Sequence, residues 1–408
     1  MGKVRFFNIP YAVAVLLQFI AISTYGGIDT VLFNNDVSDI PFRIPAVAQA
    51  KNGDIIVLSD YRKCRADIGY GEVDVVAKIG KDNGSVWSDA ILIADGTGIK
   101  NDLACGYGDA SVVADKESNE ILIMLVTGNV PYPQSTRINP VRTAFVRGTF
   151  DDRTARWVFS VPTDVTDDIY SLLPDVTGLF FTSGKIHQSR YIKKDKYYRI
   201  YSGLCTLQGN FVVYSDDFGL TWNVLGSNIQ SCIPNGDECK CEELPNGDLL
   251  LSSRTDYGRI FNIFHYKDIQ NGEGYWDKPQ MPSVENHGIY NTGTSCNGEI
   301  LLVQVKRKSD KENTCLILQT MPARNGRNDV TLYYKELKCE TKQVFSSRIA
   351  KDWQGSFQIS TTSSAYSSMI QLADGQIAVF LEESGRNGGY NMRYVTYSVE
   401  QITNGRYY

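Results

Sequence analysis

Histidine is scarce in this chain of 408 residues, and no two histidines have the spacing of metal ligands. The three histidines are His187, His265 and His287. A buried or surface position suits each of them better than coordination, and the pair Cys239 and Cys241 alone is a weak metal signal. We therefore predict neither a catalytic metal nor a cofactor.

An excess of basic residues is also absent, since 41 Lys and Arg stand against 46 Asp and Glu, for a formal charge of −5. Nothing in this balance suggests a nucleic-acid partner. Long amphipathic helical runs and low-complexity segments are missing too, whereas the chain has 24 Tyr, 35 Gly and many Asn-Gly or Asp-Gly turns. The composition favours β structure, in one large domain or two ordinary ones.

One apolar run, residues 11–22, lies near the N-terminus behind Lys3 and Arg5 and leads into small and polar residues. This is the pattern of a secretory signal peptide, and the run is shorter than the ~20 residues of a membrane-spanning helix. We expect residues 1–26 to be a signal peptide and residues 27–408 to form the mature domain, with no membrane span. The chain is then exported, to the periplasm, the cell surface or the medium.

Cysteine spacing gives no disulfide framework. There are nine cysteines, an odd number, so at least one thiol stays unpaired within a monomer. Export permits disulfides, but the sequence leaves their pairing open.

A hairpin signal, Asn-Gly or Asp-Gly before an apolar strand, recurs along the chain. Clear copies lie at Asn52-Gly53, Asn246-Gly247, Asn297-Gly298 and Asp374-Gly375, and looser ones at residues 112–121 and 191–198. Hairpins repeated at such intervals predict an all-β fold, a six-bladed β-propeller of four-stranded antiparallel blades.

A second motif agrees with this fold. Residues 215–222 read Ser-Asp-Asp-Phe-Gly-Leu-Thr-Trp, and residues 80–87 are a degenerate copy. In such an Asp-box the Ser and Asp side chains bond the loop backbone, Gly supplies positive φ and Trp packs under the blade. We interpret the motif as structural, so its carboxylates are not candidate acids.

The first hairpin gathers charged residues at one sheet edge. Arg43 enters the hairpin, Arg62 leaves it, and Asp67 lies on the loop just beyond. Arg43 precedes Gly53 by ten residues, so its side-chain parity is less secure than that of Arg62. Two guanidiniums beside a carboxylate indicate a site that binds an anion and that also contains an acidic side chain.

In two further hairpins, one residue lies nine positions before the turn glycine and another lies seven positions after it. The pairs are Glu238 with Arg254, and Tyr366 with Glu382. Equal offsets place side chains at equal heights on the same face of each blade. We therefore expect all four to meet the charged residues of the first hairpin at the mouth of the channel.

In this order and spacing the chain resembles the exo-α-sialidases (neuraminidases), particularly the bacterial retaining type. The resemblance covers residues 42–386. It rests on Phe-Arg-Ile-Pro at 42–45, Asp-Tyr-Arg at 60–62, Asp-Ile-Gly at 67–69, the box at 215–222, the run at 238–244, Ala-Tyr-Ser at 365–367 and Phe-Leu-Glu at 380–382. It implies a six-bladed propeller that removes terminal α-linked sialic acid from glycoproteins, glycolipids or oligosaccharides, so the partners are sialylated glycans.

The resemblance implies three arginines that bind the carboxylate of sialic acid. Arg43 and Arg254 match two of them, and Arg327 is the third, with Arg324 as its neighbouring alternative. Arginine suits this role because its planar fork matches a carboxylate. Glu382 is expected to hold Arg43 in position, with Glu383 as its adjacent rival.

The resemblance also assigns the chemistry. Tyr366 is the nucleophile, a neutral group that does not repel the substrate carboxylate, and Glu238 is its base. Asp67 is the general acid, because it lies on a loop. Its rivals, Asp60 and Asp74, belong to predicted strands.

Arg62 and Asp109 match positions that contact the 4-hydroxyl and N-acyl region of the sugar, although Asp109 also fits a turn residue. A trans-sialidase or intramolecular variant is the alternative enzyme. A non-catalytic sialic-acid-binding propeller and an unrelated propeller scaffold are the alternatives from other classes. The sequence leaves open the linkage preference, the natural substrate and the oligomeric state.

Overall fold

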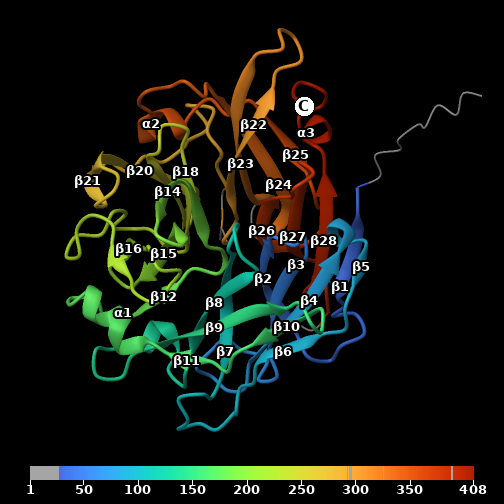
Figure 1. Ribbon diagram of the computed structural model, residues 1–408, viewed down its shortest axis with the longest axis vertical. Helices are drawn as coiled ribbons and strands as arrows, with labels where there is room; N and C mark the ends of the chain where they lie inside the picture. The colour runs from blue at the N-terminus through green and yellow to red at the C-terminus, as the bar shows by residue number, and fades with distance from the viewer. Residues whose placement is uncertain (1–26, 292, 294–295, 325, 387–388) are drawn as a thin grey trace, which may run out of the picture.

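The computed structural model describes residues 27–291, 293, 296–324, 326–386 and 389–408. The expected signal peptide, residues 1–26, lies outside the described residues. The strands form six sheets arranged around a central axis (Figure 1). In the part of the chain that the structure describes, none of the helices has the length and apolar character needed to cross a membrane.

The first three blades follow one another along the chain. The first contains β2 (Phe42–Gln49), β3 (Ile55–Tyr61), β4 (Asp74–Lys81), β5 (Val86–Trp87) and β6 (Ile91–Ala94). The second contains β7 (Tyr107–Ala114), β8 (Glu120–Thr127), β9 (Arg142–Asp151), β10 (Arg156–Phe159), β11 (Thr163–Asp164) and β13 (Gly184–Lys185). The third contains β12 (Leu179–Phe181), β14 (His187–Lys194), β15 (Tyr197–Thr206), β16 (Gly209–Ser215) and β17 (Asn223–Val224).

The other three blades have four strands each. The fourth contains β18 (Cys239–Glu243), β19 (Leu249–Thr255), β20 (Gly258–Asp268) and β21 (Glu273–Trp276). The fifth contains β22 (Ile300–Lys306), β23 (Asn313–Arg324), β24 (Asn328–Leu337) and β25 (Gly355–Gln358). The sixth contains β26 (Ser364–Gln371), β27 (Ile377–Glu383), β28 (Asn391–Tyr397) and β1 (Asp29–Phe33).

The helices are short. α1 (Thr166–Leu172) lies between the second and third blades, and α3 (Val399–Ile402) follows the last strand. The others lie between strands of one blade: α2 (Ser346–Ile349) and the 3₁₀ turns η1 (Asp82–Gly84) and η2 (Tyr132–Gln134). The predicted six-bladed propeller is confirmed. The first three blades carry additional short strands, and one of these, β13, runs parallel to β7.

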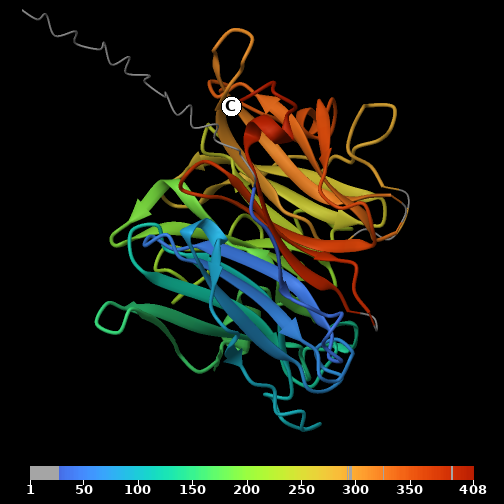
Figure 2. The ribbon, with the colours of Figure 1, turned by 90° about the vertical axis from the view of Figure 1, so that its right-hand side faces the viewer.

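Three of the four clear hairpin signals lie where they were predicted. Gly53, Gly247 and Gly375 occupy turns between the first two strands of a blade, with φ of 87°, 87° and 88°. Asn297-Gly298 is different, because it precedes β22, and the fifth blade makes its turn later, at residues 307–312. The physical reason is packing: Asn297 donates to the Ser183 carbonyl, and a Cβ at position 298 would collide with the β23 backbone. The β22–β23 hairpin (orange) projects from the body of the molecule in Figure 1 and Figure 2.

The ring closes in the sixth blade, where β1 from the beginning of the chain pairs with β28 near its end. Arg393 of β28 binds Asp29 of β1, with Nη2 and Oδ2 2.7 Å apart. The same arginine reaches Glu383 of β27 at 3.1 Å, so one guanidinium ties three strands of this blade together.

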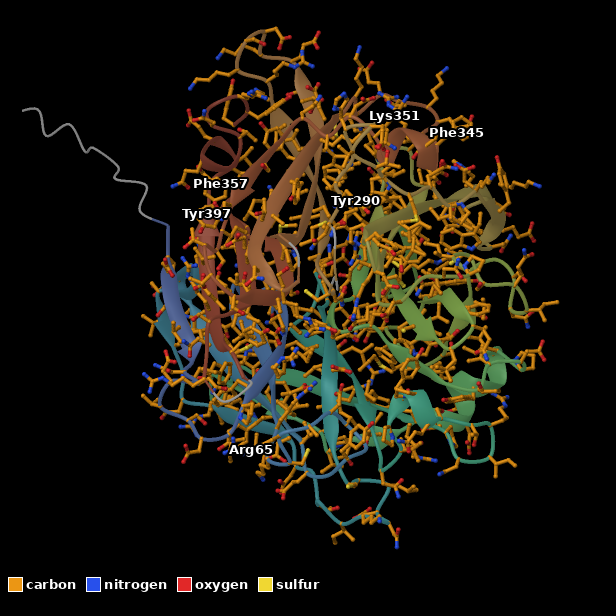
Figure 3. All side chains as sticks on the ribbon, turned by 180° about the vertical axis from the view of Figure 1, so that it is seen from behind. Arg65, Tyr290, Phe345, Lys351, Phe357 and Tyr397 are labelled. Carbon is orange, nitrogen blue, oxygen red and sulfur yellow. A yellow bond between two sulfur atoms is a disulfide. The ribbon has the colours of Figure 1, made fainter. Side chains whose placement is uncertain are left out.

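Buried apolar side chains fill the space between neighbouring blades. Between the fifth and sixth blades, Leu318 and Val330 share a cluster with Met369 and Val379. At the outer side of this contact the rings of Phe357 and Tyr397 meet with centroids 4.7 Å apart, as seen from behind in Figure 3. Each such side chain contributes on the order of 2 kcal/mol by leaving water, so packing between blades holds the ring together.

The loop at residues 215–222 has the hydrogen bonds that its sequence indicates. Asp217 Oδ1 accepts from the backbone N–H groups of Leu220 (3.0 Å) and Thr221 (2.8 Å), while Oδ2 accepts from the Thr221 hydroxyl (2.6 Å). Gly219 has a φ of 83°, and Trp222 is buried in the core of the third blade. The Asp217 carboxylate therefore holds a turn together, and Asp217 is not one of the predicted site residues.

Replacing Asp217 with Ala should lower the free energy of unfolding by about 1–3 kcal/mol, because several donors lose a shared acceptor. Urea denaturation followed by tryptophan fluorescence measures the change. Asp152→Ala, at an exposed turn residue of the second blade, is the control and should stay within about 0.5 kcal/mol of the parent. Equal stability of the two variants would contradict the structural interpretation of this loop.

Candidate active site

A pocket of about 320 Å³ opens where the inner strands of several blades converge. Eight of the nine residues that were predicted from the sequence line it: Arg43, Arg62, Asp67, Asp109, Glu238, Arg254, Arg327 and Tyr366. The ninth, Glu382, is fully buried beside Arg43. The expected convergence is therefore present, whereas the individual roles remain predictions.

The inner strands are irregular where they reach this pocket. The pairing of β2 with β3 shifts register between Arg43 and Ala46, and that of β7 with β8 shifts between Gly108 and Ser111. Within the two shifts, Ile44 and Asp109 adopt positive φ, of 59° and 47°. Bulges of this kind re-aim side chains next to functional sites.

A phenol and a carboxylate meet in the pocket. The Tyr366 hydroxyl donates to Glu238 Oε2 at 2.6 Å, and Arg254 Nη1 lies 2.8 Å from the same oxygen and 3.1 Å from the hydroxyl. Burial raises the pKa of Glu238. Burial, together with the Glu238 charge, raises the pKa of Tyr366 well above its ordinary value. Tyr366 is thus a neutral phenol at pH 7, and its proton is hydrogen-bonded to the Glu238 carboxylate.

Glu382 fixes two parts of the site at once. Its Oε1 accepts from Arg43 Nε (2.7 Å) and from the Ile44 N–H (2.8 Å), while Oε2 accepts from the Tyr366 N–H (3.1 Å). Burial opposes the charged form of Glu382, but the Arg43 guanidinium outweighs this and lowers the pKa of Glu382. The structure thus contains the expected contact between Glu382 and Arg43, whereas the functional role of Glu382 remains a prediction.

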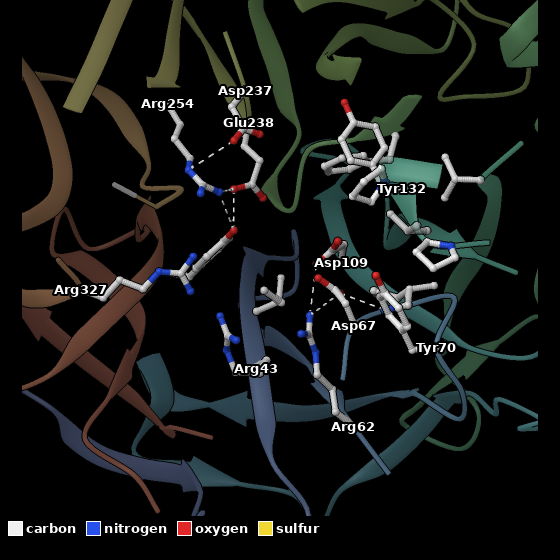
Figure 4. Close-up of a pocket in the computed structure, with 18 residues that line it drawn as sticks. Arg43, Arg62, Asp67, Tyr70, Asp109, Tyr132, Asp237, Glu238, Arg254 and Arg327 are labelled. Carbon is white, nitrogen blue, oxygen red and sulfur yellow. Dashed lines mark hydrogen bonds and ion pairs between the residues drawn. The ribbon is translucent and has the colours of Figure 1, made fainter. Parts of the chain in front are cut away.

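Three guanidiniums surround the Tyr366 phenol. Arg254 donates a hydrogen bond to the Tyr366 hydroxyl. The Cζ atoms of Arg43 and Arg327 lie 5.7 and 5.4 Å from the centroid of the Tyr366 ring. Figure 4 shows Arg43, Arg254 and Arg327 pointing toward one region of the pocket. The side chain of Arg324, the alternative to Arg327, lies outside the described part of the chain.

Asp67 stands on the other side of the pocket, on the loop that joins β3 to β4 (Figure 4). Its side chain is 60% exposed and its Oδ1 lies 3.1 Å from Arg62 Nη2. The same guanidinium binds the buried Asp60 at 2.9 Å and reaches Asp109 at 3.8 Å. Burial raises the pKa of Asp60 to about 7 and raises that of Asp109 well above the ordinary value. Of the two rivals of Asp67, Asp60 lies in β3 and Asp74 begins β4, and neither lines the pocket.

No family model matches the sequence. A sialidase of Vibrio cholerae is 26% identical to the chain over 196 residues, which is 43% of this chain and 23% of that protein. Less than half of the chain is thus similar in sequence to a sialidase. The chain spans about a quarter of the length of the curated sialidases that it matches.

Solved sialidase structures share the fold. A Hadza microbial sialidase superposes with a TM-score of 0.67 and 17% identity, covering 89% of this chain and 66% of that one. The intramolecular trans-sialidase of Ruminococcus gnavus gives a TM-score of 0.67 and 14% identity, covering 92% of this chain and 98% of that one. At these identities the comparison shows the fold alone, a propeller like that of the solved sialidases.

Several pocket residues of this sialidase fold were missed in the sequence. An apolar wall is formed by Val126, Val141 and Phe180, with the Tyr132 hydroxyl 3.4 Å from Cys205 Sγ at its edge. In the sequence these residues resemble ordinary core residues, so no signal distinguishes them from the rest of the core. Another missed residue, Asp237, lies 3.5 Å from Arg254, and its position beside Glu238 was the available signal.

Replacing Glu382 with Gln should lower the free energy of unfolding at pH 7 by about 3 kcal/mol, because the buried Arg43 loses its counter-charge. The pKa of Glu382 is lowered by folding, so its contribution is present above the ordinary value near 4.5 and is lost as pH falls through the lowered pKa. The gap between parent and variant should therefore shrink toward pH 3, as measured by denaturant unfolding at both pH values.

The control is Glu383→Gln, the adjacent residue, whose partly exposed side chain pairs with Arg393. It should cost less than about 1 kcal/mol at pH 7. A gap for Glu382→Gln that stays constant or widens on acidification would contradict this account of the pair.

Proposed function

We propose that the chain is an exo-α-sialidase that hydrolyses terminal α-linked sialic acid from glycoproteins, glycolipids or oligosaccharides, with retention. The observation that carries the proposal is the 2.6 Å hydrogen bond from Tyr366 to Glu238 inside a pocket that also contains three guanidiniums. Sialidases are the glycosidases that use a Tyr nucleophile in place of a carboxylate.

The three guanidiniums explain the choice of sugar. Sialic acid carries its carboxylate directly on the anomeric carbon, and Arg43, Arg254 and Arg327 bind it by charge-assisted hydrogen bonds. The bound carboxylate then sits next to the phenol of Tyr366, because all three guanidiniums adjoin that residue. A neutral nucleophile is required there, since a second carboxylate would be repelled.

In the first step the Tyr366 oxygen forms a bond to the anomeric carbon while its proton passes to Glu238. The bond from the anomeric carbon to the leaving oxygen breaks, and Asp67 gives that oxygen a proton. In the second step Asp67 takes a proton from water, the water oxygen bonds to the anomeric carbon, and the phenol departs and regains its proton from Glu238. Two inversions give the α-anomer of free sialic acid.

Arg62 and Asp109 complete the site beside Asp67. Burial raises the pKa of Asp109, and its carboxyl is placed to hydrogen-bond a hydroxyl or acyl group of the sugar. Arg62 bridges the acids of this side and keeps Asp67 aimed at the pocket.

The second candidate is an intramolecular trans-sialidase, which the similarity to the Ruminococcus gnavus structure favours. That reaction needs water to be kept from the intermediate. The 60% exposure of the Asp67 side chain supports hydrolysis instead, because water reaches the base of the second step.

We further propose that the protein is exported. The signal-peptide pattern of residues 1–26 supports this. So does the disulfide between Cys315 of β23 and Cys339 just after β24, since disulfides persist in oxidising compartments.

Tyr366→Phe should lower turnover of a fluorogenic sialoside at least about 100-fold, because the nucleophilic oxygen is removed. Tyr394→Phe is the control, since it deletes a hydroxyl of β28 that donates to the Asn83 carbonyl of the first blade, and Tyr394 does not line the pocket. The control should retain parent activity. Full turnover by Tyr366→Phe would rule out the assigned nucleophile.

Proton NMR during the first minutes of sialyllactose cleavage distinguishes the two enzyme candidates. We expect the α-anomer of free sialic acid to appear first and to mutarotate afterwards, because retention requires two inversions. An anhydro sugar or a transferred product as the first species would replace hydrolysis with one of the transfer reactions.

A further inference from the structure

The ammonium of Lys63 sits among three carboxylates beside the candidate active site. Lys63 Nζ lies 2.5 Å from Glu72 Oε1, 2.7 Å from Asp74 Oδ2 and 3.9 Å from Asp95 Oδ1. One oxygen from each of the three acids lies within 4.8 Å of the others. The hydrogen bonds to Asp74 and Glu72 raise the pKa of Lys63, so its charge is permanent at physiological pH.

These contacts lie at the neck of the loop that carries Asp67. The loop comprises residues 62–73 between β3 and β4, so Lys63 is at its beginning and Glu72 at its end. The Cys64 N–H also donates to the Glu72 carbonyl at 2.9 Å. Asp74 is a fixed anchor, because it is buried at the start of β4 and accepts from the Gly96 N–H at 2.9 Å.

The far part of the loop is held independently. Ile68 is buried in the apolar wall, and a Cβ at Gly69 would collide with the Val130–Pro131 backbone. Asp67 lies between these two anchored parts, with its side chain exposed to the pocket. Residues 63–67 thus run from the neck contact to these anchored residues, and Asp67 is the last of them before Ile68.

Without a cation the three carboxylates at the neck repel one another, and Asp74 has little access to water that would screen it. We propose that Lys63 is a positioning residue that clamps the neck of the 62–73 loop and so holds Asp67 within reach of the leaving oxygen. This inference rests on the proposed sialidase function, since it concerns the acid of that reaction.

The test uses substrates that differ in their need for an acid. Sialyllactose has a poor leaving group that must be protonated, whereas 4-nitrophenyl sialoside has a leaving group that departs without much help. Lys63→Met should lower kcat/KM roughly 10- to 100-fold for sialyllactose and less than about threefold for the nitrophenyl sialoside. Lys63→Arg, which keeps the cation, should retain most of the activity on both.

Lys81→Met is the matched control. This exposed lysine of β4, in the same blade, pairs with Asp54 at 3.0 Å and lies at the opposite end of the strand from the loop. It should leave both rates unchanged. Equal losses on both substrates for Lys63→Met, or no loss on either, would overturn the positioning role.

A second arm replaces the ammonium with another cation. Lys63→Ala leaves three carboxylate oxygens around an opened space, a donor set that suits Ca²⁺. Millimolar CaCl₂ should restore a large part of the sialyllactose activity of Lys63→Ala, but not that of Lys63→Met, whose side chain fills the space. A Lys63→Ala protein that gains no activity from Ca²⁺, or fails to fold with or without it, counts against the clamp.

The parent protein separates the two levels of inference. Parent activity on both sialosides, combined with a failed prediction for the Lys63 variants, overturns the clamp and leaves the proposed function intact. A parent without activity on either sialoside overturns the proposed function, and the clamp with it.

Discussion

One buried carboxylate holds the centre of this molecule together. Glu382 binds the Arg43 guanidinium, the Ile44 N–H and the Tyr366 N–H, with distances of 2.7, 2.8 and 3.1 Å. These partners belong to the first and sixth blades, which are the two blades that meet when the ring closes. The Arg43 guanidinium, which lies in the pocket, and the Tyr366 backbone, which positions the phenol, are thus held by the same carboxylate. The geometry of the pocket depends on this contact more than on any other.

The pocket is a compromise between function and stability. Three guanidiniums gathered around one phenol repel one another, and the propeller tolerates them because buried carboxylates stand behind two of them: Glu382 behind Arg43 and Glu238 behind Arg254. Arg327 has the Tyr366 ring face beside it. The arrangement is therefore preorganised for an anion, because the cations are already fixed and desolvated before any ligand arrives.

Period-two patterning was enough to place Glu238, Arg254, Tyr366 and Glu382 on one face, because strand parity is a local property that the sequence carries directly. Arg327 and Asp109 were instead predicted through the family resemblance. Equal offsets placed Glu238 and Tyr366 correctly, and they form a hydrogen bond. The ten-residue offset of Arg43 did not fit that pattern, and the register shift that follows Arg43 in β2 accounts for it. The bulges and the close packing at Gly298 could not be predicted, because contacts with neighbouring strands determine them. The apolar wall around Phe180 escaped because its residues serve equally well as core.

Ring closure has a consequence for the order of folding. Arg43 and Glu382 are 339 positions apart, whereas the hairpins that build each blade join neighbouring segments. Local hairpins form early, and contacts between distant parts of a chain form late because closing a large loop costs entropy. Individual blades can thus be in place while the pocket is still divided between the two ends of an open arc. The pocket is complete only when that arc becomes a circle, so a nascent or truncated chain lacks it until the last blade docks.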